Sequence, residues 1–194
     1  MFIVFIIFII FIIYNTRENT KENFDNNMAV YQRAANLGIK YLDKIVSFKD
    51  KSAVMFDIDD TLLFVNGDKL SPITPIIDLL NYCITKDLLI IIITARSSNY
   101  RTETIKHLNK YGINYSYLYL RKSPQDDNDM NFKSRVKQKL LNDHNITILM
   151  SVGDQMVDIV GDYSGYCLKL PSRISNDNRL FDRLPGSNKI KEII

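Results

Sequence analysis

Cysteine is scarce in this chain of 194 residues: only Cys83 and Cys167 occur. They form no Cys-x-x-Cys pair, which excludes the usual cysteine-based metal sites. Both lie in apolar stretches, which favours two buried free thiols. A single disulfide between them is the alternative, so the sequence leaves the redox compartment open.

The chain also lacks any block of basic residues. Its 25 Lys and Arg and 22 Asp and Glu give a net charge of +3, and these charges are spread along the sequence. Nucleic-acid and lipid-headgroup surfaces usually appear as basic clusters, so we expect no nucleic-acid partner. The charged fraction of 24% and the apolar fraction of 46% are typical of a globular domain. The length predicts one domain with a sizeable core, plus a tail or anchor.

Charge is entirely missing from residues 1–14, which are mostly Ile and Phe. As a helix this segment would measure about 21 Å, which is short for a bilayer core of ~30 Å. No basic residues precede it and no small-x-small cleavage site follows it, unlike an ordinary secretory signal. We predict a short membrane anchor or an atypical signal sequence, and hence membrane association on a side that the sequence leaves undetermined. A buried strand or helix is the alternative.

Two further segments complete the predicted organisation. Residues 15–27 are polar and of mixed charge, which is typical of a linker. From Met28 to Phe48, apolar residues recur at helical spacing and predict an amphipathic helix docked on the domain. The predicted units are thus an apolar segment at 1–14, a linker at 15–27 and one globular domain at 28–194.

Apolar strands and helical segments alternate through that domain. The spacing predicts helices from about Pro72 to Lys86 and at 99–110, 132–141 and 155–160, and Asn66-Gly67 predicts a tight hairpin. Unbroken apolar runs predict buried strands at 53–56, 88–93, 115–120, 146–152 and 166–170. This alternation predicts an α/β fold with a mostly parallel sheet.

The first of these strands runs directly into two carboxylates, Asp57 and Asp59. Ligands of open α/β sheets bind beyond the carboxyl ends of the strands, where these two acids are expected. Two neighbouring carboxylates repel each other, and a hard cation such as Mg²⁺ between them would relieve the repulsion. An acidic turn without a function is the alternative.

Other polar side chains are expected at the same edge of the sheet. They are carboxylates for a metal or for nucleophilic attack, a hydroxyl, and an ammonium group for an anion. These candidates are Asp57, Asp59, Thr94, Lys133, Asp154 and Asp158. By contrast, the two histidines, His107 and His144, have no partner that the sequence identifies.

Four segments resemble, in order and spacing, the four motifs of the haloacid-dehalogenase (HAD) superfamily of phosphohydrolases. They are Asp57-Ile-Asp-Asp-Thr61, the apolar strand ending at Thr94, Lys133, and Gly153-Asp-Gln-Met-Val-Asp158. Finer features resemble the acid phosphatase branch with class C bacterial and plant-type enzymes, subfamily IIIB. These are Thr94-Ala-Arg96, Lys133-Ser134, Gly153-Asp-Gln155 and Leu168-Lys-Leu-Pro171. The resemblance covers about residues 28–184 and implies a Rossmann-like, three-layer fold.

The resemblance also implies a mechanism. Asp57 would attack phosphorus and form an aspartyl-phosphate, and Asp59 would act as general acid and then as general base. Mg²⁺ would be held by Asp57, Asp154 and the main-chain carbonyl of Asp59. Thr94 and the neighbouring amide of Ala95 would bind phosphate oxygens. Lys133 would neutralise phosphate charge and would be positioned by Asp158.

The segment between Asp57 and Thr94 has room for a hairpin and one helix, but not for a large cap domain. We therefore expect an open site and a small phosphomonoester as substrate. Two alternatives remain: a nucleotidase or polynucleotide end phosphatase of the same superfamily, and a non-catalytic storage or scaffold protein. The sequence does not indicate the oligomeric state.

Overall fold

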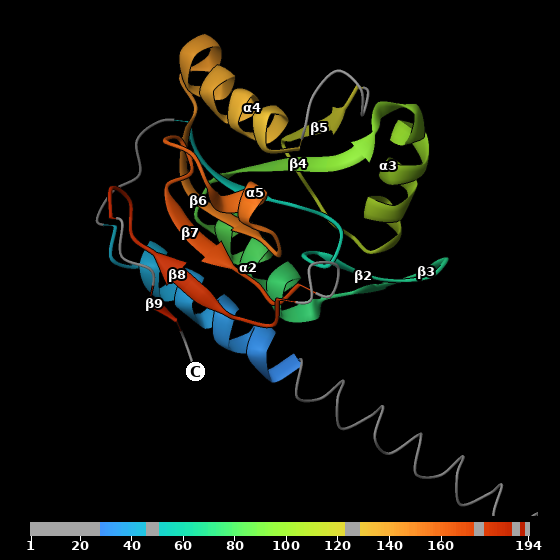
Figure 1. The fold of residues 1–194 in the computed structure, drawn as a ribbon, viewed down its shortest axis with the longest axis horizontal. Coiled ribbons are helices and arrows are strands. Elements are labelled where there is room, and N and C mark those ends of the chain that lie inside the picture. Colours follow the sequence, from blue (N-terminus) through green and yellow to red (C-terminus); the bar gives the residue numbers. More distant parts are fainter. Residues whose placement is uncertain (1–27, 46–50, 123–128, 173–176, 188–190, 193–194) are drawn as a thin grey trace, which may run out of the picture.

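The computed structural model of the chain describes residues 28–45, 51–122, 129–172, 177–187 and 191–192. A seven-stranded sheet forms the centre of this part of the chain (Figure 1). Its strands are β1 (Ser52–Phe56), β4 (Leu89–Ser97), β5 (Tyr117–Arg121), β6 (Thr147–Gly153), β7 (Tyr166–Lys169), β8 (Phe181–Arg183) and β9 (Lys191–Glu192). The spatial order is β5-β4-β1-β6-β7-β8-β9. The first five strands of this order pair in parallel, whereas β8 and β9 pair antiparallel, so the predicted mostly parallel sheet is confirmed.

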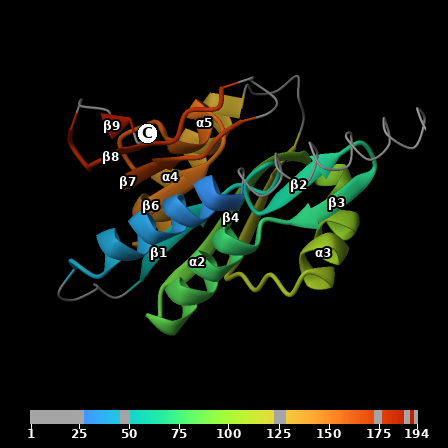
Figure 2. The ribbon, with the colours of Figure 1, turned by 90° about the horizontal axis from the view of Figure 1, so that it is seen from below.

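Helices cover both faces of the sheet and give three layers (Figure 2). One face carries the helix over residues 28–42, α2 (Thr74–Thr85) and α3 (Arg101–Lys110), and the other carries α4 (Asp129–His144) and α5 (Met156–Ile159). Alternate residues of a strand point to opposite faces. Val54 and Phe56 of β1 therefore join the core beneath α2, while Ala53 and Met55 join the core beneath α4. Both faces are buried, which explains why the strand sequences are unbroken apolar runs.

The predicted amphipathic helix docks on the domain, as expected. It buries Tyr31, Ala34, Ala35 and Leu42, and the ring of Tyr41 stacks on that of Tyr166 with centroids 4.2 Å apart. The helix ends at residue 42 rather than at Phe48, and residues 46–50 lie outside the described residues.

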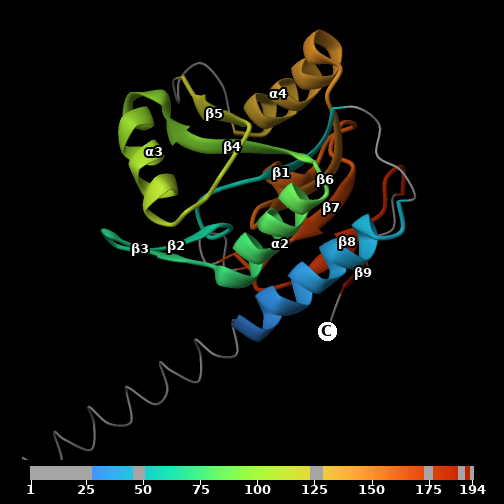
Figure 3. The same cartoon turned by 180° about the vertical axis from the view of Figure 1, so that it is seen from behind.

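In the sequence, a hairpin of β2 (Leu63–Asn66) and β3 (Lys69–Pro72) follows β1 and precedes α2. In space, it extends beyond the central sheet (Figure 3). Its turn contains Gly67 with φ of +57°, a conformation that glycine adopts without a steric penalty. The hairpin and α2 fill the interval between Asp57 and Thr94, so this interval holds no large cap domain, as predicted.

The two cysteines are both buried and free, which confirms the predicted thiols. Burial raises the pKa of the Cys83 thiol to about 12, so this group stays protonated and unreactive at neutral pH.

The prediction of a transmembrane anchor, and of membrane association through it, is contradicted. Among the described residues, no helix is both long enough and apolar enough to cross a membrane. The objection was already visible in the sequence, because a 14-residue helix of about 21 Å does not reach across a core of ~30 Å. The segments at 1–14 and 15–27 lie outside the described residues, and the division of the chain at these boundaries stays a prediction.

Candidate active site

The chain makes a tight loop where β1 ends, and this loop carries both motif carboxylates. The backbone N–H of Asp57 donates to the carbonyl of Val152 in β6 at 3.2 Å, which extends the sheet by one residue. The carbonyl of Ile58 then accepts the N–H groups of Thr61, Leu62 and Leu63. Asp60 has φ of +52°, a left-handed conformation that aspartate tolerates better than most residues. The loop leaves Asp57 buried at the sheet edge and Asp59 partly exposed.

Lys133, near the start of α4, lies between two buried carboxylates. Its Nζ is 2.7 Å from Oδ1 of Asp57 and also donates to Oδ1 of Asp158. Burial alone would lower the pKa of Lys133, but the two carboxylates outweigh burial and raise it, so the ammonium stays charged. Burial raises the pKa of Asp57, and Lys133 opposes that shift. We call these three residues the lysine–aspartate cluster.

Asp154 follows β6 and is fully buried beside this cluster. Its backbone N–H donates to Thr61 Oγ1 at 3.1 Å, and its Oδ2 accepts the hydroxyl of Ser172 at 2.6 Å. Its other oxygen, Oδ1, is buried and has no hydrogen-bond partner among the described residues. Burial raises the pKa of Asp154 to about 6. A buried carboxylate oxygen without a partner is costly, which points to a missing positive ligand.

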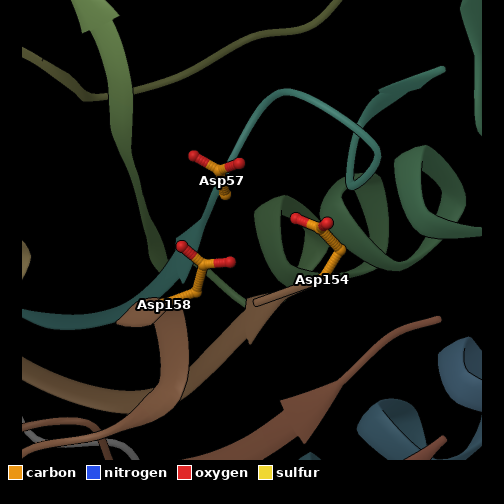
Figure 4. Close-up of side chains that lie close together, drawn as sticks. All are labelled: Asp57, Asp154 and Asp158. Atoms are coloured by element: carbon orange, nitrogen blue, oxygen red, sulfur yellow. The ribbon is translucent and has the colours of Figure 1, made fainter. Parts of the chain in front are cut away.

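Asp57, Asp154 and Asp158 converge from β1, the end of β6 and α5 (Figure 4). Each offers a carboxylate oxygen, and these atoms all lie within 4.8 Å of one another. Oxygen ligands in this arrangement suit a hard divalent cation. The structure thus groups Asp158 with the predicted ligands Asp57 and Asp154, whereas the side chain of Asp59 is engaged elsewhere.

Asp59 forms an ion pair with Arg96, a residue to which the sequence assigned no role. Arg96 Nη2 donates to Asp59 Oδ1 at 2.6 Å, and Arg96 Nε donates to Asp59 Oδ2 at 2.9 Å. This two-pronged geometry fixes the plane of the carboxylate. The pairing leaves only the main chain of Asp59 available for the predicted metal contact.

Thr94 and Ala95 lie at the same edge of the sheet as Asp57. Phe56 is paired with Ile92, and Thr94 follows two residues later. The pairing of β4 with β5 becomes irregular between Thr94 and Ser97, where the strand leaves the regular sheet. Thr94 is buried, and its Oγ1 accepts the N–H of Arg96 at 3.3 Å. All the predicted site residues therefore lie at one sheet edge.

Asp158 holds its place through a capping box at the start of α5. Its Oδ2 accepts the backbone N–H of Gln155 at 2.9 Å, and the Gln155 side chain caps the helix in return. Gly153 makes this close approach possible, because a Cβ on Gly153 would lie 2.1 Å from Cβ of Asp158.

Gly153→Ala is therefore expected to lower the free energy of unfolding by about 1–3 kcal/mol or more. The buried Asp158 cannot move aside without leaving Lys133. Chemical denaturation would measure the loss. Gly38→Ala is the control, because a Cβ there meets only the flexible ends of two side chains, Leu79 Cδ2 at 2.9 Å and Met150 Sδ at 3.3 Å. Equal small losses in both variants would contradict the steric role of Gly153.

A second buried lysine, Lys137, was not among the site residues predicted from the sequence. Its Nζ donates to the carbonyl of Asp158, to Ser164 Oγ at 2.9 Å and to the carbonyl of Val160 at 3.4 Å. Burial lowers its pKa to about 8. Lys137 thus ties α4 to the segment around α5 that carries Asp158. A signal was present: Lys133 and Lys137 are four residues apart, which places them on one helix face.

Comparison with known proteins identifies the family of this chain. The sequence matches the family model described as HAD superfamily, subfamily IIIB (Acid phosphatase), over residues 64–182, which is more than half of the chain. The chain belongs to this family, so the predicted phosphatase family is confirmed. The match begins just after the loop that carries Asp57 and Asp59. No curated protein matched the sequence.

Solved structures show the same fold. The class C acid phosphatase from Bacillus anthracis is similar with a TM-score of 0.55 and 23% identity, over 71% of this chain and 66% of that one. Its tungstate-bound structure is similar with a TM-score of 0.54 and 21% identity, over 70% of this chain and 66% of that one. A chain of the Pnkp1/Rnl/Hen1 complex is similar with a TM-score of 0.55 and 21% identity, over 64% of this chain and 47% of that one. This chain thus covers about half to two thirds of the length of those proteins.

Proposed function

We propose that this protein hydrolyses small phosphate monoesters, with Asp57 as the nucleophile and Mg²⁺ as the cofactor. The observation that carries the proposal is the lysine–aspartate cluster beside the unpartnered oxygen of Asp154. A buried nucleophile, a fixed ammonium group and a candidate cation site within one sheet edge are what phosphoryl transfer needs. Membership of the acid phosphatase family supports the same reaction.

In the first step, a carboxylate oxygen of Asp57 attacks phosphorus while the bond from phosphorus to the leaving oxygen breaks. Asp59 enters this step in its protonated form and gives that proton to the leaving oxygen, so the product leaves as an alcohol. Lys133, Thr94 and the amide of Ala95 stabilise the phosphate oxygens. The buried, charged Lys133 is worth more here than a surface lysine, because little water screens it.

In the second step, Asp59 takes a proton from water, and the water oxygen attacks the phosphorus of the aspartyl-phosphate. The bond between phosphorus and Asp57 breaks, which releases phosphate and regenerates the carboxylate. Arg96 holds Asp59 in one plane for both proton transfers. This positioning is the contribution of the fold, since proton transfer requires hydrogen-bond distances.

Asp57, Asp154 and the main-chain carbonyl of Asp59 are the proposed Mg²⁺ ligands. The bound ion would supply positive charge that screens the nucleophile from the phosphate and stabilises the transition state. Asp158 then keeps the role of positioning Lys133, to which it is already bound. The unpartnered Oδ1 of Asp154 would receive its missing partner from the ion.

Mg²⁺ is expected to raise the melting temperature of chelator-treated protein, and to raise it more at pH 7.5 than at pH 5. The pKa of Asp154 is raised from 3.8 to about 6, so the stabilising proton on this carboxyl is lost as pH rises through about 6. Above that pH the cation compensates the buried charge, and below it the cation must displace a proton. Thermal unfolding measures the shift. Asp154→Asn should abolish it, and an unchanged shift in that variant would contradict the proposed ligand set.

A phosphate-release screen tests the function itself. It would compare sugar phosphates, nucleotides, aryl phosphates and an oligonucleotide with a terminal phosphate, each with Mg²⁺ and after chelation. We expect Mg²⁺-dependent release from small monoesters. Absence of release from every substrate would favour the storage or scaffold alternative and contradict the proposal.

The second candidate is a phosphatase acting on polynucleotide ends. The likeness to a chain of the Pnkp1/Rnl/Hen1 RNA repair complex raises this possibility, although at 20–21% identity the likeness concerns the fold alone. The spread of charge along the sequence argues against it. Preference for the oligonucleotide in the screen would decide in its favour.

A further inference from the structure

Asp59 is linked to helix α3 through Arg96. The guanidinium grips both oxygens of Asp59 from one side. On its other side, Arg96 Nη1 lies 3.5 Å from Nδ1 of His107. His107 therefore contacts the group that orients Asp59, although the sequence identified no partner for it.

The surroundings of His107 favour a ring that accepts a hydrogen bond from Arg96. Glu103 precedes it by one helical turn, and its Oε1 lies 4.0 Å from His107 Nε2. A carboxylate on that side favours a proton on Nε2, which leaves the lone pair of Nδ1 directed at the Arg96 N–H. The contact of His107 with Arg96 thus adjoins the pair of Arg96 with Asp59, whereas Glu103 lies beyond hydrogen-bond distance of the ring.

A contact with His107 would restrict the conformation of the Arg96 side chain. The side chains of Arg96 and Asp59 are 15% and 28% exposed, so water reaches the pair and competes for its hydrogen bonds. An arginine side chain also has many rotamers, so the carboxylate alone does not hold it in one place. A second contact on the far side of the guanidinium restricts these rotamers.

We propose that His107 is a positioning residue for proton transfer: it holds Arg96 in the orientation in which Arg96 fixes the carboxylate of Asp59. The inference rests on the proposed role of Asp59 as general acid. His107 acts through Arg96, so its loss misplaces the acid but leaves the nucleophile Asp57 and the phosphate contacts intact. Misplacement of a reacting group by about 1 Å can cost a hundredfold in rate.

The dependence on the leaving group tests this role. An alkoxide needs a proton as it leaves, whereas p-nitrophenolate leaves readily without one. Because kcat/KM reports the steps up to departure of the leaving group, it separates the two cases. We expect His107→Leu to lower kcat/KM about tenfold or more for glycerol 3-phosphate and less than about twofold for p-nitrophenyl phosphate.

Two matched variants complete the experiment. His107→Asn keeps an acceptor near the position of Nδ1 and should restore most of the loss on glycerol 3-phosphate. Asn109→Ala, at an exposed position of α3, should leave both substrates unaffected. His107 lines an open hollow of about 500 Å³ with Tyr100 and Lys106, so replacing the ring does not disturb the core.

Asp59→Asn, measured in parallel, separates this inference from the proposed function. If Asp59→Asn is selective against glycerol 3-phosphate but His107→Leu lowers both substrates equally or neither, the positioning role is wrong. If Asp59→Asn itself lowers both substrates equally, the general acid is wrong and the inference falls with it. If both Asp59→Asn and His107→Leu lower kcat/KM selectively for glycerol 3-phosphate, the result supports the positioning role of His107.

Discussion

Asp57→Asn is expected to reduce phosphate release roughly a thousandfold or more while leaving the domain folded. The amide is nearly isosteric with the carboxylate but is a poor nucleophile, so no aspartyl-phosphate forms. Asp57 is buried at the end of a strand in the middle of the sheet, and the amide can still accept from Lys133. Phosphate release and thermal unfolding should be measured on the same preparation.

Asp143→Asn is a suitable control, because this exposed carboxylate lies at the far end of α4, where it pairs with Lys139. It should match the parent protein in both measurements. Substantial turnover by a folded Asp57→Asn protein would exclude covalent catalysis through Asp57.

Lys133→Met is expected to cause the largest loss of stability, about 3–5 kcal/mol at neutral pH. Lys133 is 2% exposed, and its removal leaves Asp57 and Asp158 buried without their shared cation. Methionine matches the length of the lysine stem, so the loss reports on charge rather than on a cavity. Chemical denaturation measures the stability, and activity should be lost with it.

Two further variants identify the cause of that loss. Lys139→Met lies on the same helix with a side chain that is 66% exposed, and it should change stability by less than about 0.5 kcal/mol. Adding Asp158→Asn to Lys133→Met removes one of the stranded charges and should recover part of the stability. If the double variant is as unstable as the two single losses added together, the residues are not coupled.

Much of the fold follows from the sequence, because buried parallel strands have a strong signature. The runs at 53–56, 88–93 and 146–152 correspond to β1, β4 and β6, and strand pairing then brings Asp57, Thr94 and Asp154 to one edge. The antiparallel strands β8 and β9 have no such signature. They are two or three residues long, contain charged side chains and continue the sheet from β7.

The partners of the site residues were harder to predict. Arg96 reaches Asp59 across 37 positions of sequence, and Ser172 reaches Asp154 from beyond β7. Such contacts depend on side-chain direction at the ends of strands, which no spacing rule contains. The same limitation applies to His107, whose only sequence signal is the glutamate one helical turn before it. The two buried lysines of α4 could have been predicted, because Lys133 and Lys137 are four residues apart and therefore lie on one face of a helix.

The most direct test of the account is to identify the phosphorylated residue during turnover. Rapid acid quenching of the Mg²⁺-loaded protein with p-nitrophenyl phosphate, followed by peptide mass spectrometry, would locate the phosphoryl group. We expect it on Asp57, removable by hydroxylamine as an acyl phosphate, and more abundant in Asp59→Asn because that variant lacks the base for the second step. Turnover without any covalent phosphate, or with phosphate on a different residue, would contradict the account.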